Sequence, residues 1–117
     1  MTEPTPIELK LTIEFQRKVR VLAKKYRRIR FDLQDVLQKL QAGDFVGDRL
    51  QEVGSTVIKA RVKNSDAQKG KSGGYRLIYW LQSPSRVILL DIYSKSEQED
   101  IDIAEIQRIL INYEDMP

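Results

Sequence analysis

Thr56-Val-Ile-Lys-Ala-Arg-Val-Lys63 is the first of three strand-like segments between residues 56 and 95. The second is Gly74–Gln82 and the third is Arg86–Ser94, and a loop rich in glycine and lysine, Asn64–Gly73, separates the first from the second. Consecutive strands with short connections predict an antiparallel meander, because tight turns join only antiparallel neighbours. We therefore expect an α+β domain built on an antiparallel, meander-based sheet.

One face of this predicted sheet is basic. Lys59, Arg61 and Lys63 alternate with apolar residues, so a two-residue period places three cations on one face. The loop and the second strand add three more cations, Lys69, Lys71 and Arg76. Cations at this density repel one another, and an ordinary solvated surface intersperses acids among them. The pattern therefore predicts a phosphate-binding surface, and the plain alternative is a set of long side chains lying over an open sheet face.

Helical patterns lie on both sides of the three strands. Thr12 is a candidate N-cap for a first helix, and a second helical pattern follows closely and stops at Gly43. Asp102 and Glu105 have the capping-box spacing of a final helix. A short strand at Ile7–Leu11 comes first, so the expected order is βααβββα, with a helical hairpin and a C-terminal helix.

Length and composition predict one globular domain over residues 1–117, with Met1–Pro6 as a loose leader. Hydrophobic residues make up 41% and charged residues 32% of the chain, which excludes a disordered protein. No apolar run approaches the roughly 20 residues that span a bilayer, and the first residues lack the features of a signal peptide. We expect a cytoplasmic protein that does not bind membranes.

The chain contains no cysteine and no histidine. Disulfides, thiol nucleophiles, Ser-His-Asp triads and the usual zinc sites are therefore excluded, and we expect neither a metal nor a small-molecule cofactor. Proton transfer must use Tyr, Lys, Asp or Glu, and charge stabilisation must use Arg, Lys or backbone N–H groups.

Three segments resemble the strand signatures of the RelE/ParE superfamily of bacterial toxins: Val57-Ile-Lys-Ala-Arg-Val62, Lys69-Gly-Lys-Ser-Gly-Gly-Tyr-Arg-Leu-Ile-Tyr79 and Leu89-Leu-Asp-Ile-Tyr-Ser-Lys95. The glycine-rich loop is most similar to that of the RelE- and HigB-like branch. This resemblance implies a RelE-like fold and the toxin of a type II toxin–antitoxin system. It also implies a metal-independent endoribonuclease, an mRNA interferase, that stops translation by cutting mRNA in the ribosomal decoding site. Its partners would be a cognate antitoxin, mRNA and the ribosome.

The resemblance also assigns site residues. Arg76 matches the arginine of the family's Gly-Tyr-Arg signature, and the Lys-Ala-Arg spacing matches basic residues of the preceding strand. Tyr93 and Lys95 end the last strand and could exchange protons with a ribose if neighbouring cations lowered their pKa. We expect five catalytic residues, Arg61, Lys71, Arg76, Tyr93 and Lys95. Four more are expected to bind RNA, namely Lys59, Lys63, Lys69 and Trp80.

The sequence departs from the family pattern after the last strand. The ribosome-dependent RNase of the family carries an arginine and a later tyrosine there, whereas this chain has Lys95, Ser96 and Asp102, with no tyrosine before Tyr113. Two alternatives follow: a ParE-like inhibitor of DNA gyrase, or a non-catalytic member that only binds its antitoxin. Eight cations and no acid lie between Arg17 and Arg30, and we expect an acidic antitoxin to dock on this run.

Overall fold

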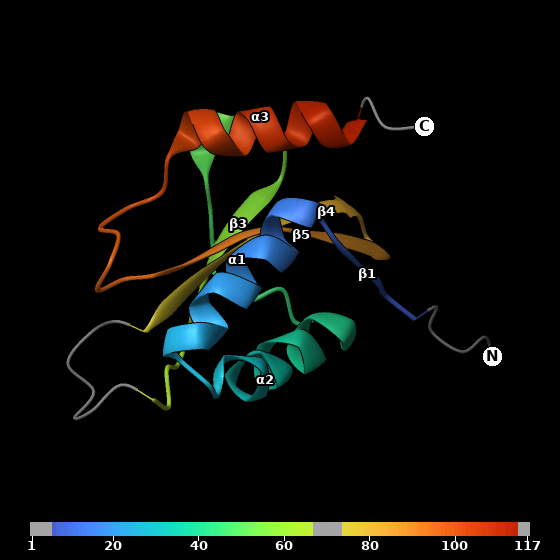
Figure 1. Cartoon of the computed structure of the whole chain (residues 1–117). Helices are drawn as coiled ribbons and strands as arrows, with labels where there is room; N and C mark the ends of the chain where they lie inside the picture. The colour runs from blue at the N-terminus through green and yellow to red at the C-terminus, as the bar shows by residue number, and fades with distance from the viewer. Residues whose placement is uncertain (1–5, 67–73, 115–117) are drawn as a thin grey trace.

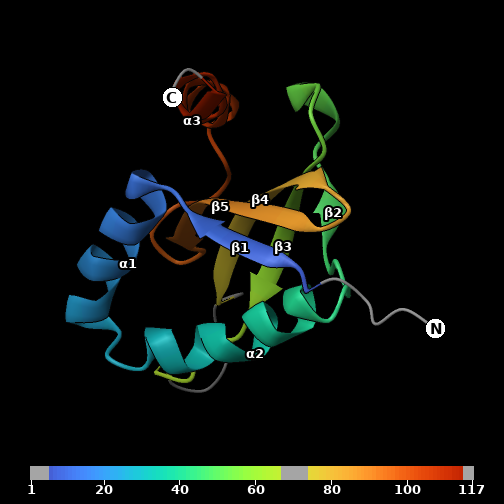
Figure 2. The same cartoon turned by 90° about the vertical axis from the view of Figure 1, so that its right-hand side faces the viewer.

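The computed structural model describes residues 6–66 and 74–114. A central sheet separates two helical layers, with α1 and α2 on one side and α3 on the other (Figures 1 and 2). The elements follow the order β1, α1, α2, β2, β3, β4, β5, α3, with a 3₁₀ helix, Gln51–Val53, after β2. The predicted α+β class, helical hairpin and C-terminal helix are therefore confirmed.

The predicted meander forms the centre of the sheet. Strand β3 (Val57–Val62) pairs antiparallel with β4 (Tyr75–Ser83), which pairs antiparallel with β5 (Arg86–Ser94). The strand order across the sheet is β1-β5-β4-β3-β2. Gly74 stands where the chain enters β4 with φ +69°, and a Cβ there would lie 2.3 Å from the carbonyl oxygen of Val62. Only glycine fits this close approach.

Both outer strands of the sheet differ from the sequence-based expectation. The sheet is not entirely antiparallel, and the connection predicted to be irregular contains a short strand. Strand β1 (Glu8–Leu11) joins the sheet beside β5, but the two strands run parallel. No tight turn connects them, so the constraint that makes hairpin neighbours antiparallel does not act on β1. The connection at Gly43–Ser55 contains the short strand β2 (Asp48–Arg49), which pairs with β3.

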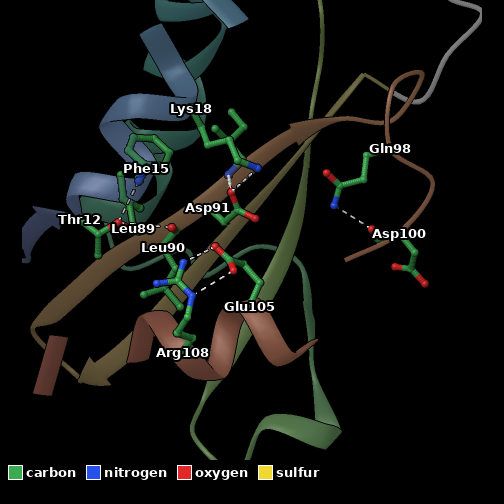
Figure 3. Close-up of polar contacts among 11 residues, drawn as sticks. Thr12, Phe15, Lys18, Leu89, Leu90, Asp91, Gln98, Asp100, Glu105 and Arg108 are labelled. Atoms are coloured by element: carbon green, nitrogen blue, oxygen red, sulfur yellow. Dashed lines mark hydrogen bonds and ion pairs between the residues drawn. The ribbon is translucent and has the colours of Figure 1, made fainter. Parts of the chain in front are cut away.

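Side-chain caps begin the first and last helices. Helix α1 (Ile13–Lys25) starts after Thr12, whose hydroxyl accepts the N–H of Phe15 at 3.1 Å, as predicted. The same hydroxyl donates to the carbonyl of Leu89 at 2.9 Å, which fixes the start of α1 against β5 (Figure 3). Helix α2 is Ile29–Gln41, and α3 is Ile103–Glu114. The Asp102 carboxylate accepts the Glu105 N–H at 3.3 Å, as the capping-box spacing predicted.

Two hydrophobic cores form on the two faces of the sheet. Ile58, Ala60 and Val62 of β3 pack with α1 and α2 in the larger core. Val57, Ile78 and Trp80 pack with α3 in the smaller one. Because side chains alternate along a strand, the cations of β3 must share the α3 face with Val57. Within the described residues, no helix is long and apolar enough to cross a membrane.

Candidate active site

The strand register brings three predicted site residues into one row. Arg61 lies directly opposite Arg76, and Arg76 lies directly opposite Tyr93 on the next strand. Lys59 lies two pairs away, opposite Ile78, and therefore projects from the same face of β3 as Arg61. We call Arg61, Arg76 and Tyr93 the cross-strand row. The cations of β3 and β4 that sequence patterning placed on one face therefore share a face.

Burial differs sharply along the row. Arg61 is exposed, whereas Arg76 is only 8% exposed and Tyr93 only 3%. Arg76 Nη1 donates to the carbonyl of its neighbour Tyr75 at 3.3 Å. A guanidinium held in partly desolvated surroundings acts on an anion more strongly than one in bulk water.

The environment of Tyr93 corrects one expectation. Burial raises the pKa of the Tyr93 phenol above its ordinary value of 10.0, the Asp100 carboxylate raises it further, and Arg76 only partly opposes them. The proton exchange with a ribose that the sequence suggests for Tyr93 depends on neighbouring cations lowering this pKa. The phenol is instead held neutral, so it is suited to donate a proton and unsuited to accept one at neutral pH.

An acidic residue that the sequence did not single out lies beside the row. Asp100, in the connection between β5 and α3, places Oδ1 at 3.5 Å from the Lys59 ammonium. The backbone N–H of Ile101 donates to the same oxygen at 2.7 Å, and that bond and then Lys59 lower the pKa of Asp100. Figure 3 shows Asp100 next to Gln98, whose amide donates to the Asp100 carbonyl at 2.9 Å. Lys59 is therefore partly neutralised by a carboxylate in the free protein.

The remaining predicted lysines are dispersed. The Lys95 amine donates to the carbonyl of Glu99 in the same connection. Lys63 is exposed beyond the end of β3, where it lines a groove of about 440 Å³ with Arg61 and with Asp32 of α2. Lys69 and Lys71 lie outside the described residues.

A polar cluster holds Ser65 and Asp66, just after β3, against the helical layer. Asp32 accepts the N–H of Ser65 at 2.9 Å and its hydroxyl at 3.1 Å. Asp66 accepts the N–H of Arg28 at 2.7 Å, and the Arg28 guanidinium donates to the Ser65 hydroxyl at 3.0 Å. Ser65 and Asp66, which follow β3, are therefore held against the turn between α1 and α2 and against the first turn of α2.

Trp80 is the clearest departure from the predicted site. Its indole is 8% exposed, belongs to the core beneath α3 and meets the ring of Tyr113 edge-on at 6.1 Å. A base could stack on it only if α3 left the sheet, so the position of Trp80 does not support its assignment as an RNA-binding residue. Tyr113 lies in the same contact and does not replace the distal tyrosine of the family pattern.

Two further carboxylates, Asp91 of β5 and Glu97 just after it, form ion pairs with lysines of α1. The Asp91 carboxylate is buried and forms an ion pair with the Lys18 ammonium at 3.2 Å (Figure 3). Burial raises the pKa of Asp91, and the charge of Lys18 partly opposes this rise. Glu97 accepts the Tyr26 hydroxyl at 2.8 Å and lies 3.5 Å from the Lys25 amine. Both contacts hold α1 against the β5 end of the sheet.

Two comparisons with known proteins bear on the family and the fold of the chain. A family model described as the RelE toxin of the RelE/RelB toxin–antitoxin system matches residues 15–112. Among solved structures, a free-state mutant of the E. coli toxin RelE superposes with a TM-score of 0.52 and 15% identity, covering 93% of this chain and 98% of that chain. That likeness shows the fold. No curated protein matches the chain.

Proposed function

Because the chain belongs to the RelE toxin family, we propose that it is an endoribonuclease that cleaves mRNA in the decoding site of the ribosome. The observation that carries this proposal is the cross-strand row, in which two guanidiniums and a neutral phenol share one face of the sheet. Like charges directly opposite each other destabilise a sheet, so the Arg61–Arg76 pair favours an anionic ligand that offsets their repulsion. In the family that this chain resembles, the arginine that corresponds to Arg76 is an active-site group.

The row provides the chemistry of metal-independent RNA cleavage. The ribose 2′-oxygen bonds to the adjacent phosphorus, the bond from phosphorus to the 5′-oxygen breaks, and a 2′,3′-cyclic phosphate and a 5′-hydroxyl result. Arg61 and Arg76 stabilise the charge that develops on the phosphate. Tyr93 donates a proton to the leaving 5′-oxygen, since its phenol is neutral. Its ring belongs to the same core beneath α3 as Trp80, so this role requires the phosphate to reach the phenol hydroxyl beside Arg76 at the edge of that core. Lys95, two residues further along the chain, accepts the proton of the 2′-hydroxyl in its neutral amine form, because an ammonium has no lone pair to accept it.

In the proposal, four lysines extend this surface along the RNA backbone: Lys59, Lys63, Lys69 and Lys71. A flexible lysine makes a good point contact to a phosphate, and each such contact strengthens binding at low salt. Lys71 is also kept as a candidate that stabilises the cleaved phosphate. Trp80 is left out, because α3 covers it.

Mapping of cut sites in cells tests the proposal. After brief induction of the toxin, primer extension on one mRNA should show cuts inside its translated frame, in phase with codons. The matched control is the same transcript with its start codon removed, in which the cuts should disappear. Equal cutting of both transcripts would show that the ribosome is not required. Intact mRNA together with inhibited DNA supercoiling would instead favour a gyrase inhibitor.

A further inference from the structure

The groove beside β3 continues the cross-strand row toward the helical layer. Its volume is about 440 Å³, and residues of α2 and of the end of β3 line it. Arg61 belongs both to the row and to the lining of this groove, and Lys63 lines it two residues further along. An RNA strand whose phosphate contacts Arg61 would therefore place an adjacent nucleotide at the groove. We call this hollow the α2–β3 groove.

The α2–β3 groove carries an aromatic ring that the protein does not bury. Phe31 lines the groove, is 60% exposed and belongs to neither hydrophobic core. The Arg28 guanidinium lies over this ring, 4.7 Å from its centroid, and also donates to the Ser65 hydroxyl at 3.0 Å. A single exposed apolar residue is ordinary. Phe31 differs because its ring is held from one side only, so a flat ligand can stack on the other face.

The polar lining of the groove suits a nucleobase better than a phosphate. Asp32 and Asp35 line it, and their charges repel a phosphate backbone. Gln34 and Gln38 lie one helical turn apart on α2, are exposed and line the same groove. An amide offers both a donor and an acceptor, with which glutamine hydrogen-bonds the edge of a base. The cations of β3 thus fit phosphates, whereas the groove beside them fits a base.

We propose that the α2–β3 groove binds one unpaired base of the mRNA, next to the phosphate that Arg61 contacts. The base stacks on the open face of Phe31, and the amides of Gln34 and Gln38 hydrogen-bond its edge. Stacking on an aromatic side chain together with edge hydrogen bonds is the usual way in which proteins recognise single-stranded RNA. The inference rests on the RNA binding of the proposed function and adds a specificity subsite to it.

A base held in this groove sets the register of the RNA on the cross-strand row. One ribose joins the stacked base to the phosphate at Arg61, so fixing the base limits which phosphate lies beside Arg76. Lys63, beyond the end of β3, can contact the phosphate on the other side of the same nucleotide. Loss of the stacking contact should therefore lower affinity and blur the position of the cut.

Fluorescence of 2-aminopurine tests the stacking directly, because this base analogue loses emission when it stacks. It is placed at each position in turn of a short single-stranded RNA whose 2′-hydroxyls are all methylated, so that no attacking hydroxyl remains. Wild-type toxin should quench the probe at one position. Phe31→Leu, which keeps an apolar side chain without the ring, should abolish this quenching and bind about tenfold more weakly. Phe31→Trp should restore both.

The control is Val21→Ala, which truncates a similarly exposed apolar residue of α1 that does not line the groove. It should leave quenching and affinity unchanged. None of these variants changes charge, so the salt dependence of binding, which neutralised phosphates set, should be the same in all of them. Urea denaturation should show Phe31→Leu folded. Quenching that persists in Phe31→Leu, or an unchanged affinity, would overturn the inference.

Base preference tests the two amides. Four RNAs that differ only in the base at the quenched position should bind wild-type toxin with different affinities. Gln34→Ala/Gln38→Ala should bind all four equally, whereas Gln41→Ala, an exposed glutamine of α2 outside the groove, should keep the preference. Equal binding of the four RNAs by wild-type toxin would refute the role of the amides.

The outcomes separate this inference from the proposed function. A wild-type toxin that cleaves mRNA on the ribosome but quenches the probe at no position would refute only the inference. Quenching that depends on Phe31 in a toxin that cleaves no mRNA would refute only the enzymatic proposal. A Phe31→Leu toxin that binds RNA normally but a protein partner more weakly would assign the groove to that partner and refute the inference.

Discussion

Arg61 and Arg76 lie directly opposite each other on β3 and β4, on the face of the sheet that also carries α3. Like charges in this position destabilise a sheet, by an amount on the order of the roughly 0.2–1 kcal/mol that favourable cross-strand pairs contribute. A phosphate between the two strands would convert this repulsion into binding. The pair therefore predicts that stability and activity respond in opposite directions to the same substitution.

Replacement of Arg61 with threonine, a good strand residue, tests this trade-off. We expect Arg61→Thr to raise the free energy of unfolding by up to about 1 kcal/mol, because the repulsion with Arg76 is removed. The same variant should lose most of its RNA cleavage. Urea denaturation and a cleavage assay measure the two effects, and a variant that is both less stable and equally active would contradict the account.

Arg76 should matter most to catalysis, because it lies at the centre of the row and is partly buried. Loss of a group that stabilises a developing charge typically costs about 3 kcal/mol of barrier, so Arg76→Ala should abolish growth inhibition. Arg76→Lys should restore only part of it, since an ammonium cannot grip a phosphate with two parallel bonds. The control is Arg49→Ala, which removes an exposed arginine of β2. Full toxicity in a folded Arg76→Ala protein would remove this residue from the mechanism.

Asp100 competes with RNA for Lys59 in the free protein. Asp100→Asn should therefore strengthen binding of a short single-stranded RNA, by no more than about fivefold, the effect of one exposed ion pair. Glu99→Gln changes the net charge equally one residue away and serves as the control. Fluorescence anisotropy at low salt measures both variants. Equal affinities would mean that the Lys59–Asp100 contact does not limit RNA binding.

Buried tyrosines predict a loss of stability at high pH. Burial is the main cause that raises the pKa of Tyr75, Tyr79 and Tyr93 above 10.0. The folded state keeps these protons to a higher pH than the unfolded chain, so their contribution is complete below 10 and is lost as pH rises through the folded pKa values. Urea unfolding at increasing pH should show this decline, and Tyr93→Phe should make it shallower. Stability that stays constant while tyrosinate absorbance appears would be inconsistent with buried phenols.

Local patterns in the sequence predicted most of the fold. Each cap, at Thr12 and at Asp102, needs only a side-chain oxygen and a backbone N–H three residues further along, and alternation along β3 is a property of that strand alone. The direction of β1 could not be predicted, because it pairs with β5 across most of the chain and no turn sets its orientation.

The site required information that the sequence does not contain. Alternation placed the cations of β3 on one face, but the pairing of Arg61 with Arg76 depends on a register that no two-residue turn fixes. Asp100 reaches Lys59 through a connection of irregular shape, so spacing could not reveal the contact. Trp80 has the right parity for the basic face, and only the position of α3 shows that it is covered.

The chemistry of the RNA ends tests the central claim most directly. Purified toxin is added to ribosomes stalled with a defined codon in the decoding site, and the two new ends of the mRNA are identified by mass spectrometry. The account predicts one cut in that codon, with a 2′,3′-cyclic phosphate on one fragment and a 5′-hydroxyl on the other, and no cut by a folded Arg76→Ala variant. Intact mRNA with wild-type toxin, or fragments that carry a 5′-phosphate and a 3′-hydroxyl, would contradict it.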